Sequence, residues 1–292
     1  GDAIGEDVPL VWTSEDGLAW QPWTGEELHS GLVFAGPDGM TTLDVEELPT
    51  TEETGFSEVA AVAAGGPGWV AVGRHEADGR VWVSSDAQTW QRVEAPVFTG
   101  AWLGDVAAGG PGLVAVGGFH GIPDGKEEAG EWVSTDGLPW DRVDSTALGD
   151  EKALASVTVN PADGSLLAFG TRAVWASPDG YEWTAVHHRD NVVWLSQPPP
   201  HADTVWVEDT VFAAGGDVAF SLWASADRGA TWVRHDPADP IFAGQNINAL
   251  LLHRGKLVAV GGNSEGNENL DVGQDPIQGD PARGVIWIGE VE

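Results

Sequence analysis

One short segment recurs five times along the chain, and every copy begins and ends with tryptophan. The copies are Trp12–Trp20, Trp82–Trp90, Trp132–Trp140, Trp175–Trp183 and Trp223–Trp232. Their closing tryptophans are separated by 70, 50, 43 and 49 residues. Steps of about 40 to 50 residues are the size of one four-stranded blade of a β-propeller. The spacing therefore predicts a ring of similar β-sheet units.

A second repeated element comes before most of these copies. It consists of two apolar runs around a Gly/Pro/Asp turn, at Val62–Gly73, Val106–Gly117, Val157–Gly170 and Leu250–Gly261. Apolar runs that flank such turn residues indicate β-hairpins. One hairpin of this kind and one tryptophan-flanked hairpin supply the four strands of a blade, A to D. Four complete blades are predicted at about 56–93, 101–143, 150–186 and 204–235.

The tryptophan-flanked segment has a physical logic of its own. Its Ser and Asp side chains can accept hydrogen bonds from main-chain N–H groups of the turn between strands C and D, and Gly permits positive φ there. The second tryptophan covers the hairpin as a large apolar lid. These residues are Ser14, Asp16 and Trp20; Ser84, Asp86 and Trp90; Ser134, Asp136 and Trp140; Ser177, Asp179 and Trp183; and Ser225, Asp227 and Trp232.

This pattern resembles the Asp box (S-x-D-x-G-x-x-W) of sialidases, sortilins and related propellers, the BNR-repeat family. The segment from Asp227 to Trp232 has that family's spacing, the other four copies are one residue shorter, and Ala87 replaces the glycine of the second copy. The resemblance covers nearly the whole chain and implies an all-β propeller of four-stranded antiparallel blades. It implies a fold and not a function.

Closure of the ring is expected to use both ends of the chain. Residues 1–292 are treated as a single propeller domain, in which the hairpin at 10–23 has no obvious strands A and B, and residues 247–290 lack a strand D. Because a propeller must hide its sheet edges, these pieces should complete the ring or a neighbouring subunit. The simplest count is six blades, and a further hairpin at 31–45 would allow seven.

Composition narrows the function. Lys and Arg number 13 against 46 Asp and Glu, a formal net charge of −33. Such a field repels nucleic acid and anionic membranes. The acidity is compatible with a well-solvated surface, with divalent-cation binding, or with both. No apolar run is long enough to cross a bilayer, which predicts no membrane insertion. The chain has no cysteine, which excludes disulfides, thiolate metal sites and cysteine nucleophiles but does not locate the protein. From the resemblance to Asp-box propellers we expect an extracellular or cell-surface location.

Candidate binding residues fall on the face opposite the Asp boxes, where the long loops gather. Loop 263–284 is rich in oxygen ligands, so Asp271, Asp275 and Asp280 are weak candidates for Ca²⁺ against the alternative of a solvated acidic loop. Trp102 and Trp194 lie outside the repeat and could stack on a sugar. The candidate ligand face comprises Trp102, His120, His187, His188, Trp194 and His201, and its histidines could bind a transition metal or simply be scattered surface residues.

No catalytic motif is complete. A sialidase-like site needs a tyrosine nucleophile, yet the chain's one tyrosine, Tyr181, lies inside an Asp-box turn. No nucleophile elbow, zinc-protease motif or phosphate loop is present. The sequence therefore predicts no enzymatic activity and a structural or interaction module, leaning to a self-assembling surface or filament subunit whose partners are copies of itself. The first alternative is a glycan- or protein-binding propeller that uses the loop-rich face, and the second is a glycoside hydrolase, which needs only two carboxylates.

Overall fold

The computed structural model is almost entirely β-sheet. It describes residues 12–13, 21–22, 31–36, 39–44, 57–86, 90–120, 127–144, 146–188, 203–214, 222–235, 245–253, 256–263 and 284–290. No helix in this part of the chain is long and apolar enough to cross a membrane. Two short 3₁₀ helices, η2 (Pro96–Phe98) and η3 (Thr146–Leu148), connect sheets.

The strands form a series of antiparallel sheets in chain order. Four sheets have four strands: β5 (Ser57–Gly65), β6 (Gly68–His75), β7 (Asp78–Ser84) and β8 (Gln91–Val93); β9 (Ala101–Gly109), β10 (Gly112–Phe119), β11 (Glu128–Ser134) and β12 (Asp141–Arg142); β13 (Leu154–Val159), β14 (Leu166–Gly170), β15 (Ala173–Ser177) and β16 (Thr184–His188); and β17 (Asp203–Val207), β18 (Thr210–Ala214), β19 (Leu222–Ser225) and β20 (Val233–His235). A three-stranded sheet contains β21 (Gln245–His253), β22 (Lys256–Asn263) and β23 (Gly284–Glu290). Two hairpins, β1 (Trp12–Thr13) with β2 (Gln21–Pro22) and β3 (Gly31–Gly36) with β4 (Gly39–Asp44), complete the set.

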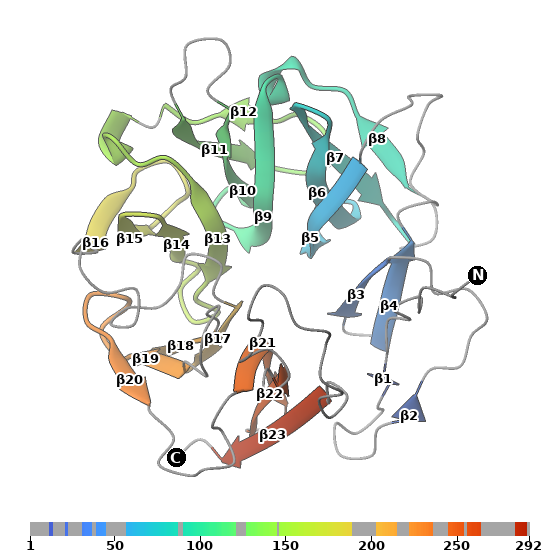
Figure 1. The fold of residues 1–292 in the computed structure, drawn as a ribbon. Helices are drawn as coiled ribbons and strands as arrows, with labels where there is room; N and C mark the ends of the chain where they lie inside the picture. Colours follow the sequence, from blue (N-terminus) through green and yellow to red (C-terminus); the bar gives the residue numbers. More distant parts are fainter. Residues whose placement is uncertain are drawn as a thin grey trace, which may run out of the picture.

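These sheets stand around a common axis as the blades of a β-propeller, which confirms the predicted fold (Figure 1). The first strand of each blade is innermost, and the first strands of neighbouring blades contact one another. The two N-terminal hairpins lie between the blade of β5–β8 and the blade of β21–β23 (Figure 1). Six blades, and closure of the ring by the two ends of the chain, stay predictions.

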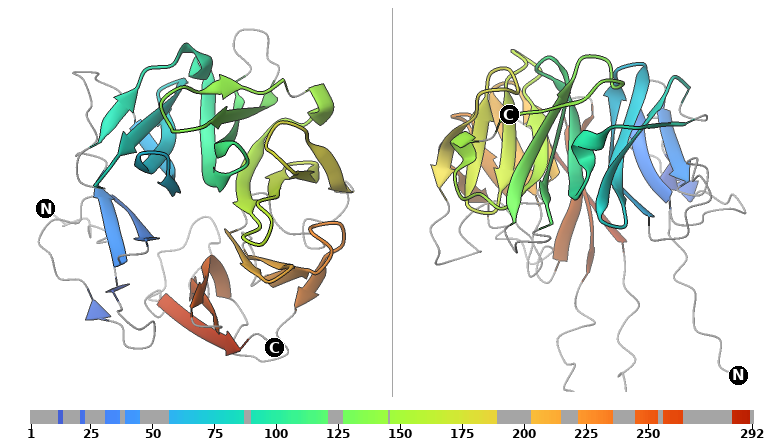
Figure 2. Two further views of the ribbon diagram at one scale, coloured as in Figure 1. Left: turned by 180° about the vertical axis from the view of Figure 1, so that it is seen from behind. Right: turned by 90° about the horizontal axis from the view of Figure 1, so that it is seen from above.

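Each blade has two ends, which give the ring two faces, and Figure 2 shows the ring edge-on. The turns between the first and second strands and between the third and fourth strands lie on one face, here called the turn face. The connections between the second and third strands, and those from one blade to the next, lie on the other, here called the connection face.

The apolar core lies between blades rather than at the axis. Val72 and Val81 of one blade pack with Leu103 and Leu113 of the next, and all four are buried. Similar layers join the next three pairs of blades. Because each layer is built from the inward faces of two sheets, every blade depends on its neighbours for burial.

Four inner strands carry one residue too many for their pairing partner. The extra residues are Ala60 in β5, Gly104 in β9, Ala155 in β13 and Asn248 in β21. A β-bulge of this kind breaks the alternation of side chains between the two faces of a strand. Leu103 and Val106 illustrate the effect, because they are three residues apart and yet share one core layer. The bulge consequently turns Asp105 toward the blade of β13–β16.

A glycine opposes each bulge on the second strand. Gly73, Gly117, Gly170 and Gly261 pair with the residue just before the extra one. A Cβ atom built on Gly117 would lie 2.0 Å from the carbonyl oxygen of Trp102. At Gly117, a glycine is therefore required by the close approach of the bulged backbone.

Replacing Gly117 by alanine should therefore lower the free energy of unfolding by about 2 kcal/mol or more, because main chain must move to admit the methyl group. The measurement is denaturant unfolding of Gly117→Ala beside Gly164→Ala. Gly164 has φ +78° but nothing within 4 Å of a built Cβ atom, so its substitution should cost about 1 kcal/mol from backbone strain alone. Equal losses for the two variants would show that the bulge tolerates a side chain.

Candidate functional site

The tryptophan-flanked turns form compact networks of hydrogen bonds. In one copy, Ser134 Oγ accepts the N–H of Gly137 at 2.8 Å, and Asp136 Oδ1 accepts that of Leu138 at 3.1 Å. Trp140 Nε1 donates to the carbonyl of Gly137 at 2.9 Å. Corresponding bonds involve Ser177, Asp179 and Trp183, and also Ser225, Asp227 and Trp232. Ser84 bonds to Asp86, and Trp90 is buried beside them; Ser14, Asp16 and Trp20 lie outside the described residues.

These turns also join neighbouring blades on the turn face. A Cβ atom on Gly66 would lie 2.7 Å from the carbonyl oxygen of Asp136, and one on Gly110 would lie 2.7 Å from that of Asp179. Both of these tryptophan-flanked turns therefore pack closely against the turn between the first and second strands of the preceding blade. The arrangement gives this face a structural role.

Two aspartates of the inner strands bond to main-chain amides of the inner strands, and each inner strand is the edge strand of its sheet. Asp105 Oδ1 accepts the N–H of Val106 at 2.7 Å, and its Oδ2 accepts that of Val157 in the next blade at 2.9 Å. In the same way Asp203 accepts the N–H of Thr204 at 3.0 Å and of Leu250 in the next blade at 2.6 Å. Each carboxylate therefore links two blades near the axis.

The environment of these carboxyl groups disfavours their charge. Burial, together with a smaller effect of the charge of Asp203, raises the pKa of Asp105 to about 7, although the two amide hydrogen bonds lower it. Burial also raises the pKa of Asp203. Both residues keep part of their surface in contact with solvent. A carboxyl group whose pKa is raised to about 7 is a candidate for acid–base chemistry.

Trp102 lies at the start of β9, at the connection-face end of that strand. It is half-buried, and the bulge places it on the same face of β9 as Asp105, opposite Leu103. Two glycines make room for its indole: a Cβ atom on Gly104 would lie 2.9 Å from Cζ3, and one on Gly118 would lie 3.1 Å from Nε1. The indole therefore occupies space that side chains at these two positions would fill.

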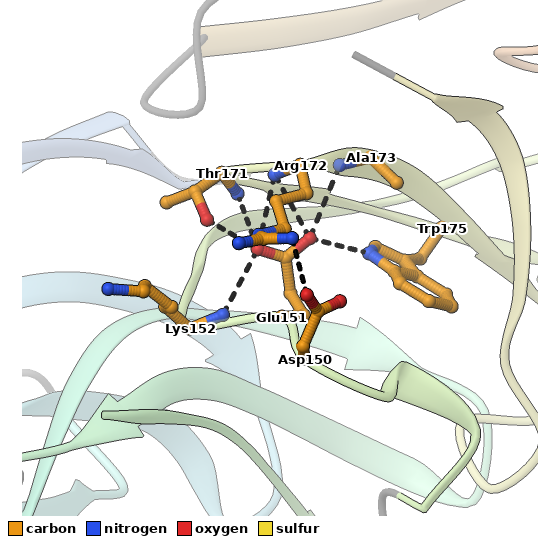
Figure 3. A network of polar contacts seen from close by, with 7 residues as sticks. All are labelled: Asp150, Glu151, Lys152, Thr171, Arg172, Ala173 and Trp175. Carbon is orange, nitrogen blue, oxygen red and sulfur yellow. Dashed lines mark hydrogen bonds and ion pairs between the residues drawn. The ribbon is translucent and has the colours of Figure 1, made fainter. Parts of the chain in front are cut away.

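At the connection face of the neighbouring blade, β13–β16, a buried carboxylate accepts several hydrogen bonds. Glu151 is 2% exposed, and its side chain lies among the donors that Figure 3 shows around it. Its carboxylate accepts main-chain N–H groups of Lys152 at 3.2 Å, Thr171 at 3.0 Å, Arg172 at 3.1 Å and Ala173 at 3.2 Å, together with the Thr171 hydroxyl and Trp175 Nε1 at 3.1 Å. A Cβ atom on Gly170 would lie 2.5 Å from Glu151 Oε2, so the glycine opposite this bulge also makes room for the carboxylate.

The predicted ligand-face residues do not all come together. His120 follows β10, and its main-chain N–H donates to the carbonyl of Gly100 at 3.0 Å, two residues before Trp102. His187 and His188 are instead part of the outer strand β16, which extends past the predicted end of its blade at residue 186. His187 Nδ1 lies 3.1 Å from the carbonyl oxygen of Ala230 in the next blade. Trp194, His201, Asp271, Asp275 and Asp280 lie outside the described residues.

Metal binding has no support among the residues that can be described. They contain no group of three or more His, Cys, Asp or Glu side chains that could hold an ion. The Ca²⁺ site stays a prediction, because its three aspartates lie outside this part of the chain.

Sequence reasoning missed Asp105, Asp203 and Glu151. Asp105 carried a signal, since it interrupts the apolar run from Leu103 to Val106. An acid in an inner strand needs hydrogen-bond donors to be retained there. Glu151 carried no such signal, because most of its donors come from residues about 20 positions later.

No protein-family model matches the chain, and no curated protein matches it. Solved structures do resemble it. YCF48 bound to a D1 peptide has 17% identity and a TM-score of 0.49, over 84% of this chain and 81% of that one. An ancestral GH74 enzyme has 14% identity and a TM-score of 0.49, over 97% of this chain and 40% of that one. A GH43 β-1,3-galactosidase has 13% identity and a TM-score of 0.43, over 81% and 56%.

These neighbours correct two expectations about function. Most of the similar structures are glycoside hydrolases of families GH43, GH74 and GH32. The predictions of a non-enzymatic structural module leaning to self-assembly, and of no enzymatic activity, are contradicted by this finding and are withdrawn. At these identities the likeness shows the fold alone, and the chain spans about half the length of the hydrolases named above.

The raised pKa of Asp105 predicts how stability depends on pH. Below about pH 4 the group is protonated in both the folded and the unfolded chain. As pH rises from 4 to 7 the unfolded chain loses this proton first, because the folded pKa is about 7, so the free energy of unfolding should fall by at most about 4 kcal/mol. Asp203 acts in the same direction.

Denaturant unfolding between pH 4 and 8 measures this effect, with Asp105→Asn as the comparison, because asparagine cannot ionise. The variant should lose much of the decline that the unaltered chain shows between pH 4 and 7. The turn aspartates do not interfere in this window. Hydrogen bonds from Tyr181 lower the pKa of Asp179, and those from Thr231 lower that of Asp227, so their contribution is lost only below about pH 4. An identical pH profile for both proteins would contradict the assignment.

Proposed function

We propose that the chain is a glycan-binding propeller whose site lies on the connection face around Trp102. The placement of this indole carries the proposal. It is half-buried at the connection-face end of β9, and it packs against Gly104 and Gly118. An aromatic face held in one orientation stacks on the apolar face of a sugar ring at little entropic cost.

Two main-chain carbonyl groups lie beside the Nε1 edge of this indole. A Cβ atom on Gly118 would lie 3.1 Å from the carbonyl oxygens of Glu128 and Lys152 as well as from Trp102 Nε1, so these groups all lie beside one another. Asp105 follows on the same face of β9. Binding sites of this kind combine an apolar platform with a few fixed polar groups that choose the ligand's orientation.

Seven other tryptophans have structural places in the repeat. Trp82, Trp132, Trp175 and Trp223 are buried on third strands, while Trp90, Trp140 and Trp183 are buried in the turns. Because these tryptophans recur with the repeat, membership of the Asp-box family is part of this proposal. An extracellular or cell-surface location, where complex glycans are common ligands, is part of it as well.

Glycoside cleavage is the second candidate, and the Asp105–Asp203 pair favours it. In most glycosidases one carboxylic acid protonates the leaving oxygen while a second carboxylate acts as base or nucleophile. Asp105, whose burial raises its pKa to about 7, would be the acid, and Asp203 would be its partner. Both also link blades, so the same hydrogen bonds would hold them in place.

Glycan binding predicts that Trp102→Ala abolishes measurable affinity, because loss of one stacking ring in a weak site removes about 1 to 2 kcal/mol or more. Trp102→Phe should retain part of it, since phenylalanine keeps an aromatic face. The measurement is a glycan-array screen followed by calorimetry on the best neutral oligosaccharide. Tyr181→Ala on the turn face, where the ring is 50% exposed, is the control and should bind normally. Unchanged affinity in Trp102→Ala would rule out this site.

Cleavage predicts turnover of a nitrophenyl glycoside from a panel assayed between pH 4 and 8. Asp105→Asn should lower kcat about 100-fold or more, because the substituted side chain has no proton to donate, and turnover should fall as pH rises above 7. Asp163→Asn is a control, since Asp163 is an exposed turn residue paired with Arg228. No turnover on any substrate, or an active Asp105→Asn protein, would remove the enzymatic candidate and leave binding.

A further inference from the structure

Two of the tryptophan-flanked turns contain an Asp–Gly pair, Asp136–Gly137 and Asp179–Gly180. In a mobile chain such a pair is chemically unstable. The main-chain nitrogen of the glycine attacks the side-chain carboxyl carbon of the aspartate, a C–N bond forms, and the N–H proton leaves with the carboxyl hydroxyl as water. Addition of water then reopens the resulting succinimide ring on either side, and one of the two products is an isoaspartate. Glycine favours this reaction because it has no side chain to obstruct the attack.

The fold requires a glycine at both positions, so the reactive pair is built into the turn. Gly137 has φ +84° and Gly180 has φ +83°, a region that other residues rarely adopt. A Cβ atom on Gly180 would also lie 2.9 Å from a methyl group of Val114. Protection of the aspartate must therefore come from other residues of the turn.

In both turns a buried serine holds the nitrogen that would attack. Ser134 Oγ accepts the N–H of Gly137, and Ser177 Oγ accepts that of Gly180, each at 2.8 Å. The two serines are only 4% and 2% exposed. The attack requires this N–H to lose its proton and to turn toward the carboxyl carbon. A buried hydrogen bond opposes both steps, because breaking it leaves a polar group without a partner.

The carboxyl group is held as well. Asp179 Oδ1 accepts the main-chain N–H of Tyr181 at 2.9 Å and that of Glu182 at 3.1 Å. Asp136 Oδ1 accepts that of Leu138 at 3.1 Å. These bonds tie each carboxyl group to N–H groups that follow the glycine. The bond from Tyr181, and then that from Glu182, also lowers the pKa of Asp179, so its protonated form, from which water can leave, is scarce at neutral pH.

We propose that Asp136 and Asp179 are latent modification sites, at which Ser134 and Ser177 prevent spontaneous isoaspartate formation. The inference is independent of the proposed function. An isoaspartate would route the main chain through the side chain and add one carbon atom to it. The turn at Asp179 could then no longer pack against Gly110 of the preceding blade, where a Cβ atom would lie 2.7 Å from the carbonyl oxygen of Asp179.

The test is prolonged incubation of the folded protein at neutral pH, followed by peptide mapping that separates aspartate from isoaspartate. Ser177→Ala should form isoaspartate at Asp179 about tenfold faster than the unaltered chain, as expected when one hydrogen bond to the attacking N–H is lost. Ser134→Ala should do the same at Asp136. Ser177→Thr keeps a hydroxyl group and should react slowly.

Each variant carries the other turn as an internal control, because a general loosening of the fold would expose both pairs. Ser225→Ala is the matched control for loss of the hydrogen bond itself. Ser225 Oγ accepts the N–H of Gly229 at 2.8 Å, but Asp227 is followed by Arg228, whose side chain obstructs the attack. No isoaspartate should therefore accumulate at Asp227 in this variant.

The chain unfolded in urea supplies the reference rate, and both Asp–Gly pairs should react fast there. Slow reaction in urea would overturn the inference, because the pairs would then need no protection. An unchanged rate at Asp179 in Ser177→Ala would overturn it too. Equal rates at Asp136 and Asp179 in that variant would assign protection to the fold as a whole and remove the role of the serine.

Discussion

The inner strands of the ring can be buried only if their main-chain N–H groups find hydrogen-bond acceptors. Each inner strand is the edge strand of its sheet, so some of its main-chain N–H groups have no partner in the ladder, and a buried N–H without an acceptor costs about 1 to 3 kcal/mol. Asp105 accepts two such amides and Asp203 accepts two more, one from each aspartate's own blade and one from the next. Two of the joints between blades, β9 with β13 and β17 with β21, therefore contain a carboxyl group whose burial makes its charge unfavourable.

The two faces of the ring have different roles. On the turn face, serine, aspartate and tryptophan satisfy the turns and press each blade against its neighbour. On the connection face, the single buried carboxylate of Glu151 accepts the main-chain N–H groups around it. The basic side chains of Lys152 and Arg172, next to it, remain exposed. The proposed function belongs to the connection face because its polar groups lie next to an aromatic ring that the turns do not use.

Much of the fold could be predicted because the repeat carries both composition and spacing. Each tryptophan-flanked segment marks a third and fourth strand, and the hairpins at Val62–Gly73 and Val106–Gly117 mark the first two. The bulges could not be predicted, since one extra apolar or small residue, such as Ala60 or Ala155, leaves the composition of a strand unchanged. The site was harder. Trp102 stood out because it lies outside the repeat, whereas the donors of Glu151 meet only when β14 and β15 fold over it. The predicted functional class was wrong because the absence of known catalytic motifs does not exclude a site that needs only two carboxylates.

Nitrogen-15 NMR of the indole N–H groups, recorded while the best neutral oligosaccharide from the array is added, tests the placement of the site most directly. Glycan binding at Trp102 predicts a shift of its indole signal together with the main-chain amides of Gly118 and Lys152, which lie beside it. The indole signals of Trp140 and Trp183, which bond to turn carbonyls on the opposite face, should stay where they are. Shifts confined to Trp140 and Trp183, with Trp102 unmoved, would contradict it and place the ligand on the turn face.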